Sequence, residues 1–76
     1  MHEPTEELDL RGMKCPMPAF LARRRLAAAP SGTVILVVTD DPMAPIDVPH
    51  MCRGEGFEHL STEQHGAEAR IILRRP

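Results

Sequence analysis

The segment from Thr33 to Thr39 constrains the fold most strongly, because its residues Thr-Val-Ile-Leu-Val-Val-Thr are β-branched or apolar without interruption. Such a run is typical of a central strand covered on both faces or nearly so. The chain has 76 residues, so we predict a single domain over residues 1–76. A domain of this size buries only about 60% of its unfolded surface, and we expect no large substrate cavity.

The rest of the chain predicts helices and further strands around this segment. Residues 18–29 favour a helix, because strong helix formers dominate and no glycine or proline interrupts them. Small and apolar side chains recur there every three or four residues, which predicts one narrow core-facing stripe. The stripe consists of Ala19, Ala22, Leu26 and Ala29. Strands are predicted over 7–11, 57–64 and 69–74, with a hairpin at His65–Gly66 and a frayed start over 1–6.

Two prolines complicate the segment after the central strand. Pro45 and Pro49 cannot both lie inside one regular helix without loss of backbone hydrogen bonds. We therefore predict a turn over 43–46 and a short helix over 47–55, with Asp47 as its N-cap. The element order is then β-α-β-α-β-β, with right-handed crossovers and helices packed on a sheet.

Cys15 is placed where a helix is expected to begin. Pro16 and Pro18 follow it closely, and proline is best tolerated in the first turn of a helix. The sulfur of Cys15 would then lie near unpaired backbone N–H groups and the positive end of the helix dipole. This position predicts a lowered pKa and a reactive thiolate.

The residues around Cys15 fit the presentation of a nucleophile. Gly12 permits a sharp turn before the cysteine, and Arg11 and Lys14 add positive charge. The two prolines would keep this loop rigid. No general base or acid accompanies the thiol in a recognisable pattern, so the sequence gives little support to a hydrolase.

The second cysteine, Cys52, is predicted to be a small buried residue with a structural role. A resolving role toward Cys15 stays open, although no spacing supports it. A metal site from Cys15, His50, Cys52 and His59 has no paired ligand motif behind it. We therefore expect no metal and free thiols.

Three aspartates lie near the ends of predicted elements. Asp40, Asp41 and Asp47 are most simply read as helix caps. If the fold brings them to the cysteine loop, they would instead tune the thiol or contact a basic partner.

A partner surface beside the cysteine is a second possibility along the first helix. Phe20 and Leu21 either widen the core-facing stripe or form a docking patch together with Met17. Arg24 lies in the run Arg23–Arg25, which is either a solvated face or a contact for an acidic partner.

Composition argues against several other classes of protein. The net charge is −2, Trp and Tyr are absent, and there are only two Phe residues, so we expect no direct binding of nucleic acid. The start has no basic region followed by an apolar run, and the longest apolar run is too short to cross a membrane. These features predict a cytoplasmic protein without a membrane segment.

The motifs together resemble the TusA/SirA-like sulfur carriers, and the TusA branch most closely. The resemblance covers nearly the whole chain and rests on Leu8-Asp9, Arg11-Gly12, Cys15-Pro16-Met17-Pro18, Pro30-x-Gly32, Asp40-Asp41-Pro42, Asp47-Val48-Pro49 and Cys52. It implies an α+β two-layer sandwich similar to the C-terminal domain of translation initiation factor 3. In that fold a four-stranded mixed sheet carries both helices on one face.

The same resemblance implies a function. Cys15 would carry a persulfide received from a cysteine desulfurase or a rhodanese-like donor, without any separate cofactor. In the TusA branch the sulfur passes to DsrE-like relay proteins, towards thiolation of the tRNA wobble uridine. Related proteins carry sulfane sulfur in sulfur oxidation. Two other functions stay open: a regulatory interaction module without sulfur transfer, and, from the fold analogy alone, nucleic-acid binding.

Overall fold

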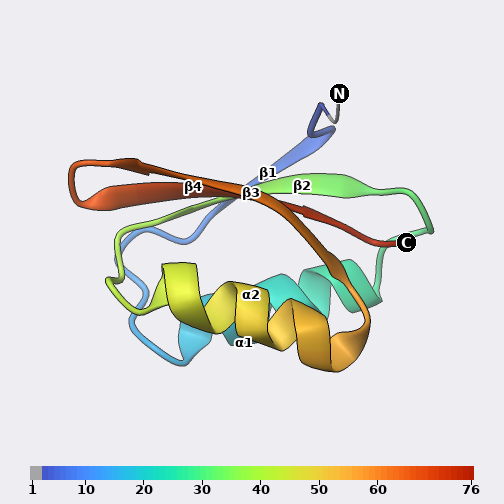
Figure 1. The fold of residues 1–76 in the computed structure, drawn as a ribbon, viewed down its shortest axis with the longest axis horizontal. Helices are drawn as coiled ribbons and strands as arrows, with labels where there is room; N and C mark the ends of the chain where they lie inside the picture. Colours follow the sequence, from blue (N-terminus) through green and yellow to red (C-terminus); the bar gives the residue numbers. More distant parts are fainter. Residues whose placement is uncertain (1–2) are drawn as a thin grey trace.

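The computed structural model describes residues 3–76 as two layers, a sheet and a pair of helices (Figure 1). Their order along the chain is β-α-β-α-β-β, as predicted. The elements are β1 (Glu6–Asp9), α1 (Met17–Ala27), β2 (Val34–Thr39), α2 (Ala44–Glu55), β3 (Glu58–His65) and β4 (Glu68–Arg74).

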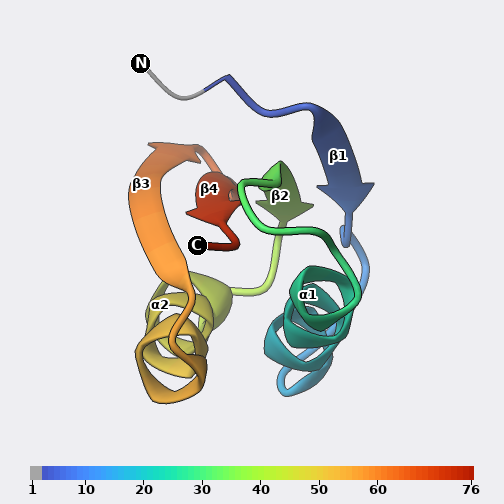
Figure 2. The same ribbon diagram turned by 90° about the vertical axis from the view of Figure 1, so that its right-hand side faces the viewer.

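The four strands form one mixed sheet in the order β1-β2-β4-β3. β1 runs parallel to β2, whereas β4 is antiparallel to both of its neighbours. The apolar segment of the sequence therefore forms an inner strand, as predicted. Both helices lie on the same face of the sheet, α1 beneath β1 and β2 and α2 beneath β3 and β4 (Figure 2).

The core lies between the sheet and the two helices. Ala22 and Leu26 of α1 are fully buried, which confirms the predicted stripe. Ile35 and Val37 of β2 face them in the same cluster. The remaining buried members come from the loop after β1, from α2 and from β4: Leu10, Ala44, Val48, Cys52, Ala69, Ile71 and Leu73.

The start of the chain is more ordered than the predicted frayed segment over residues 1–6. Residues 1 and 2 lie outside the described part. The Thr5 N–H donates to the Val34 carbonyl at 3.0 Å, and Glu6 already pairs with Ile35. The Glu6 carboxylate also receives hydrogen bonds from Arg25 of α1, so this edge strand is joined to the helix beneath it.

The predicted helix over 47–55 is wrong at its start, because α2 already begins at Ala44. Pro45 occupies the first turn, where its missing N–H costs no helical bond. Pro49 lies inside the helix and is buried, so packing compensates for the one backbone bond it removes. Asp47 is therefore a first-turn residue of α2 and not its N-cap. This extra turn brings Asp47 to the site.

Candidate functional site

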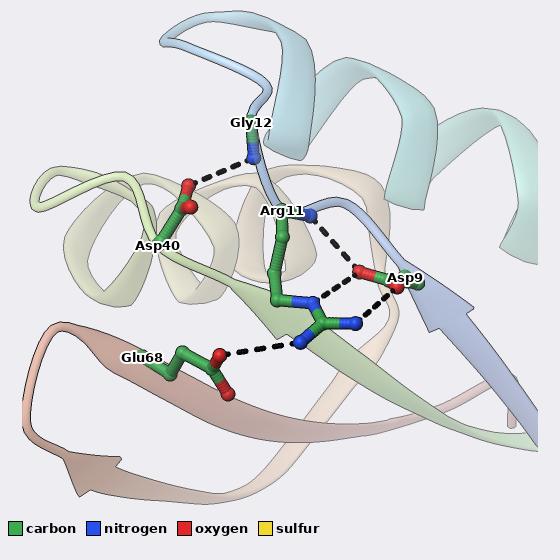
Figure 3. Close-up of polar contacts among 5 residues, drawn as sticks. All are labelled: Asp9, Arg11, Gly12, Asp40 and Glu68. Atoms are coloured by element: carbon green, nitrogen blue, oxygen red, sulfur yellow. Dashed lines mark hydrogen bonds and ion pairs between the residues drawn. The ribbon is translucent and has the colours of Figure 1, made fainter.

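The loop between β1 and α1 holds Cys15 and is fastened at several points. The Arg11 N–H donates to the Asp9 side chain at 3.1 Å, which turns the chain as β1 ends. Gly12 has φ +84, a left-handed conformation that glycine adopts without strain. Its N–H donates to Oδ1 of Asp40 at 3.0 Å (Figure 3). The loop is thus tied to the end of β2.

The sequence suggested that Arg11 adds positive charge near the thiol. In the structure, Arg11 instead links two strands of the sheet. Its guanidinium donates to both carboxylate oxygens of Asp9, at 2.9 and 2.8 Å, and to Glu68 of β4 at 3.3 Å (Figure 3). The hydrogen bonds from Arg11 lower the pKa of Asp9 to about 2. Because Asp9 and Glu68 lie on β1 and β4, this bridge crosses the intervening strand β2.

Cys15 is exposed, and its thiol is hydrogen-bonded to a carboxylate from α2. Sγ donates to Oδ2 of Asp47 at 3.0 Å. This hydrogen bond is the main cause that raises the pKa of Cys15 above its ordinary value; partial desolvation and the charges of Asp47 and Asp41 act in the same direction. The predicted lowered pKa is therefore wrong for the free protein, since a neighbouring carboxylate favours the neutral thiol.

Asp40 and Asp41, which follow β2, also lie close to the cysteine loop. Asp41 is only 8% exposed, and its N–H donates to the Thr39 hydroxyl at 3.2 Å. Its Oδ2 is buried and accepts no hydrogen bond from residues 3–76. Neither helix has a side-chain cap, so the prediction of capping aspartates is wrong, and the alternative that they approach the cysteine loop is correct.

Cys52 differs from Cys15 in its accessibility, which is one of the factors that govern thiol reactivity. It is completely buried on α2 within the core, as predicted. Burial raises the pKa of its thiol to about 11. Both cysteines are free. The structure places Cys52 in the packing between helix and sheet.

We expect a thiol reagent to label one cysteine of the native protein at neutral pH and two after denaturation. Cys15 is exposed, whereas Cys52 is shielded and stays protonated until pH approaches about 11. Peptide mapping after brief iodoacetamide treatment identifies the labelled residue. Rapid labelling of Cys52 in the native state would contradict its burial.

Exposed apolar side chains occur in the two chain segments that meet at the contact between Cys15 and Asp47. Five large hydrophobic residues of the described chain are exposed: Met13, Met17, Phe20, Met43 and Ile46. Three of them surround Cys15 in sequence, and two precede Asp47, whose side chain contacts Cys15. We call these five residues the apolar rim. Clustered exposed apolar side chains mark interaction sites more often than isolated ones do.

The four predicted partner contacts are divided between two places. Met17 and Phe20 belong to the apolar rim, and the Arg23 guanidinium lies 5.5 Å from the centre of the Phe20 ring. Leu21 is half-buried and packs against the core, so it widens the stripe. Leu21 and Arg24 line a separate apolar groove of about 270 Å³ between β1 and α1. Neither Cys15 nor Asp47 lines that groove.

Within residues 3–76 no three His, Cys, Asp or Glu side chains are grouped so that they would hold a metal ion. The same part of the chain contains no helix with the length and apolar character needed to cross a membrane. Sequence reasoning pointed to Cys15 but missed the apolar residues Met13, Met43 and Ile46. The last two lie in a segment predicted to be a turn, which gave no signal for a helix beside the thiol.

Comparison with known proteins agrees with this architecture. Residues 6–75 match the family described as sulfurtransferase TusA. A SirA-like protein from Desulfitobacterium hafniense has a similar structure, with a TM-score of 0.78 and 22% sequence identity. The superposition covers 92% of this chain and 96% of that one. At this identity the structural likeness establishes the fold alone.

The chain belongs to the TusA sulfurtransferase family. Its general role is that of a sulfur carrier that interacts with partners of a sulfur relay.

Proposed function

We propose that Cys15 carries sulfur as a persulfide, which one protein loads and another removes. The observation that supports this most is a single exposed cysteine bordered by the apolar rim. A carrier needs an accessible sulfur and a surface that fits a donor and an acceptor in turn. It does not need to enclose a small substrate.

The chemistry is an exchange at sulfur. The Cys15 thiolate attacks the outer sulfur of the donor persulfide, a new S–S bond forms at Cys15, and the donor cysteine leaves with the electron pair as a thiolate. One proton leaves Cys15 and one is taken up by the donor, so no oxidant or reductant is consumed. The acceptor cysteine then repeats the same attack on the outer sulfur of the Cys15 persulfide.

The two partners proposed are a cysteine desulfurase or rhodanese-like protein as donor and a DsrE-like relay protein as acceptor. The apolar rim would be covered in each complex, with Met17 and Phe20 next to the transferred sulfur. Methionine side chains adapt to differently shaped surfaces, which suits a carrier that binds two partners through one face. Lys14 and the rigid Pro16–Pro18 segment would hold the thiol at the centre of that face.

The pathway proposed is thiolation of the tRNA wobble uridine. The test is complementation of a bacterial strain that has lost its own TusA-family carrier and hence its 2-thiouridine. We expect the wild-type chain and Cys52→Ala to restore 2-thiouridine, measured by mass spectrometry of tRNA hydrolysates, and Cys15→Ser to restore none. Failure of the wild-type chain at normal expression would contradict this pathway and favour sulfur oxidation.

A further inference from the structure

The hydrogen bond between Cys15 and Asp47 is possible in only one state of a sulfur carrier. In the unloaded protein, Sγ bears a proton and donates it to Oδ2 of Asp47 at 3.0 Å. Once a second sulfur is attached, Sγ has no proton left to donate. The contact therefore stabilises the unloaded state specifically.

The loaded state meets an unfavourable field at the same place. A persulfide is a stronger acid than the corresponding thiol, so its outer sulfur is negatively charged near neutral pH. Asp47 and Asp41 both act on the sulfur of Cys15 through their charge. None of the ion pairs formed within residues 3–76 involves either carboxylate. Asp41 is more than nine-tenths buried, and its Oδ2 has no hydrogen-bond partner among those residues.

From this geometry we propose that Asp47 weakens the hold of Cys15 on transferred sulfur, because it favours the unloaded thiol of Cys15 over the charged persulfide. The inference rests on the proposed persulfide function and deepens it. Asp47 acts through Cys15 and is a positioning residue. Its effect is to make the loaded carrier a stronger donor of sulfur than an isolated cysteine persulfide would be.

The test is an exchange equilibrium with a small-molecule sulfur buffer. The protein is incubated with a mixture of glutathione persulfide and glutathione, and the loaded fraction is read by intact-mass spectrometry. The reaction conserves all atoms, since Cys15-SH and the glutathione persulfide give the Cys15 persulfide and glutathione. We expect Asp47→Asn to raise the equilibrium constant for loading several-fold.

Asp40→Asn is the matched control. It removes one carboxylate charge close to the cysteine loop, and the amide oxygen still accepts the hydrogen bond from the Gly12 N–H. We expect it to load like wild type. Equal loading of Asp47→Asn and wild type, or an equal rise in both variants, would overturn the assignment to Asp47.

A second measurement tests the effect of Asp47 on the Cys15 thiol in the absence of persulfide. The charged groups around the thiol are Asp47 on α2, Asp41 in the loop before it and Lys14 beside it in the chain. Removal of the Asp47 charge lowers the pKa of Cys15, so iodoacetamide should alkylate Cys15 in Asp47→Asn several-fold faster at neutral pH. A merely unfolded variant is recognised because Cys52 would also be labelled.

The two measurements separate failure of the inference from failure of the proposed function. If no variant and no wild-type protein gains sulfur, the persulfide function is contradicted, and the inference about Asp47 with it. If wild type loads but the alkylation profile of Asp47→Asn coincides with that of wild type, the function stands and the inference about Asp47 is overturned.

Discussion

Leu26→Ala is expected to lower the free energy of unfolding by about 2–5 kcal/mol. Leu26 is fully buried and belongs to the core cluster between α1 and the sheet. Truncation leaves a cavity that the surrounding residues fill only in part. In a domain this small, each 1 kcal/mol lowers the melting temperature by roughly 4–8 °C. Urea and thermal unfolding followed by circular dichroism measure the effect.

Ile46→Ala is the matched control for this substitution. Ile46 is 62% exposed on α2, so the same truncation creates no cavity, and we expect a change within about 0.5 kcal/mol. Equal destabilisation by the two variants would contradict the position of Leu26 in the core.

Much of the fold follows from residue patterns that are local. The Val34–Thr39 strand is an inner strand between β1 and β4. Its residues Ile35 and Val37 belong to the core cluster on the helix side, and the alternate residues Val34 and Val38 are buried as well. Ala22 and Leu26 of α1 and Ala29 just after it are spaced for one stripe and are buried, and Ala19 of the same stripe is half-buried. Gly56 ends α2 with φ +78, as a helix-terminating glycine does.

The start of α2 was less predictable. A proline favours a helix end or a helix start, depending on whether the residues before it can still be hydrogen-bonded. From the sequence, Pro45 and Pro49 together suggested a turn over 43–46 followed by a short helix over 47–55. Burial of Pro49 is a tertiary effect, and it favours a helix that is continuous from Ala44.

The direction of the pKa shift at Cys15 could not be predicted from the local sequence either, because it also depends on a tertiary contact. The sequence places the thiol next to a helix start and two basic residues, all of which favour the thiolate. Asp47 lies 32 residues away in sequence, and only the α2 turn that was missed brings it into contact. Arg11, meanwhile, forms ion pairs with Asp9 and Glu68.

Raised pKa and carrier function are compatible. A protonated, hydrogen-bonded thiol is slow to react with small oxidants, because the thiolate is the reactive form. Docking of a partner onto the apolar rim would exclude water and change the surroundings of Asp47. In the proposed carrier, the thiol of the free protein would therefore react more slowly than an unperturbed exposed cysteine.

Cys15→Ser is expected to abolish sulfur uptake while the fold is retained. Serine is close to cysteine in size, and position 15 is exposed, so the substitution disturbs no packing. The hydroxyl cannot form a persulfide. Cys52→Ala removes the other cysteine and is expected to keep full uptake, since Cys52 is buried and does not take part.

The most direct measurement is the intact mass of the protein after incubation with a cysteine desulfurase and cysteine. We predict that wild type and Cys52→Ala each gain the mass of one sulfur atom, that a reductant removes it, and that Cys15→Ser gains nothing. A Cys15→Ser protein that takes up sulfur as readily as wild type would contradict the assignment of the carrier site to Cys15.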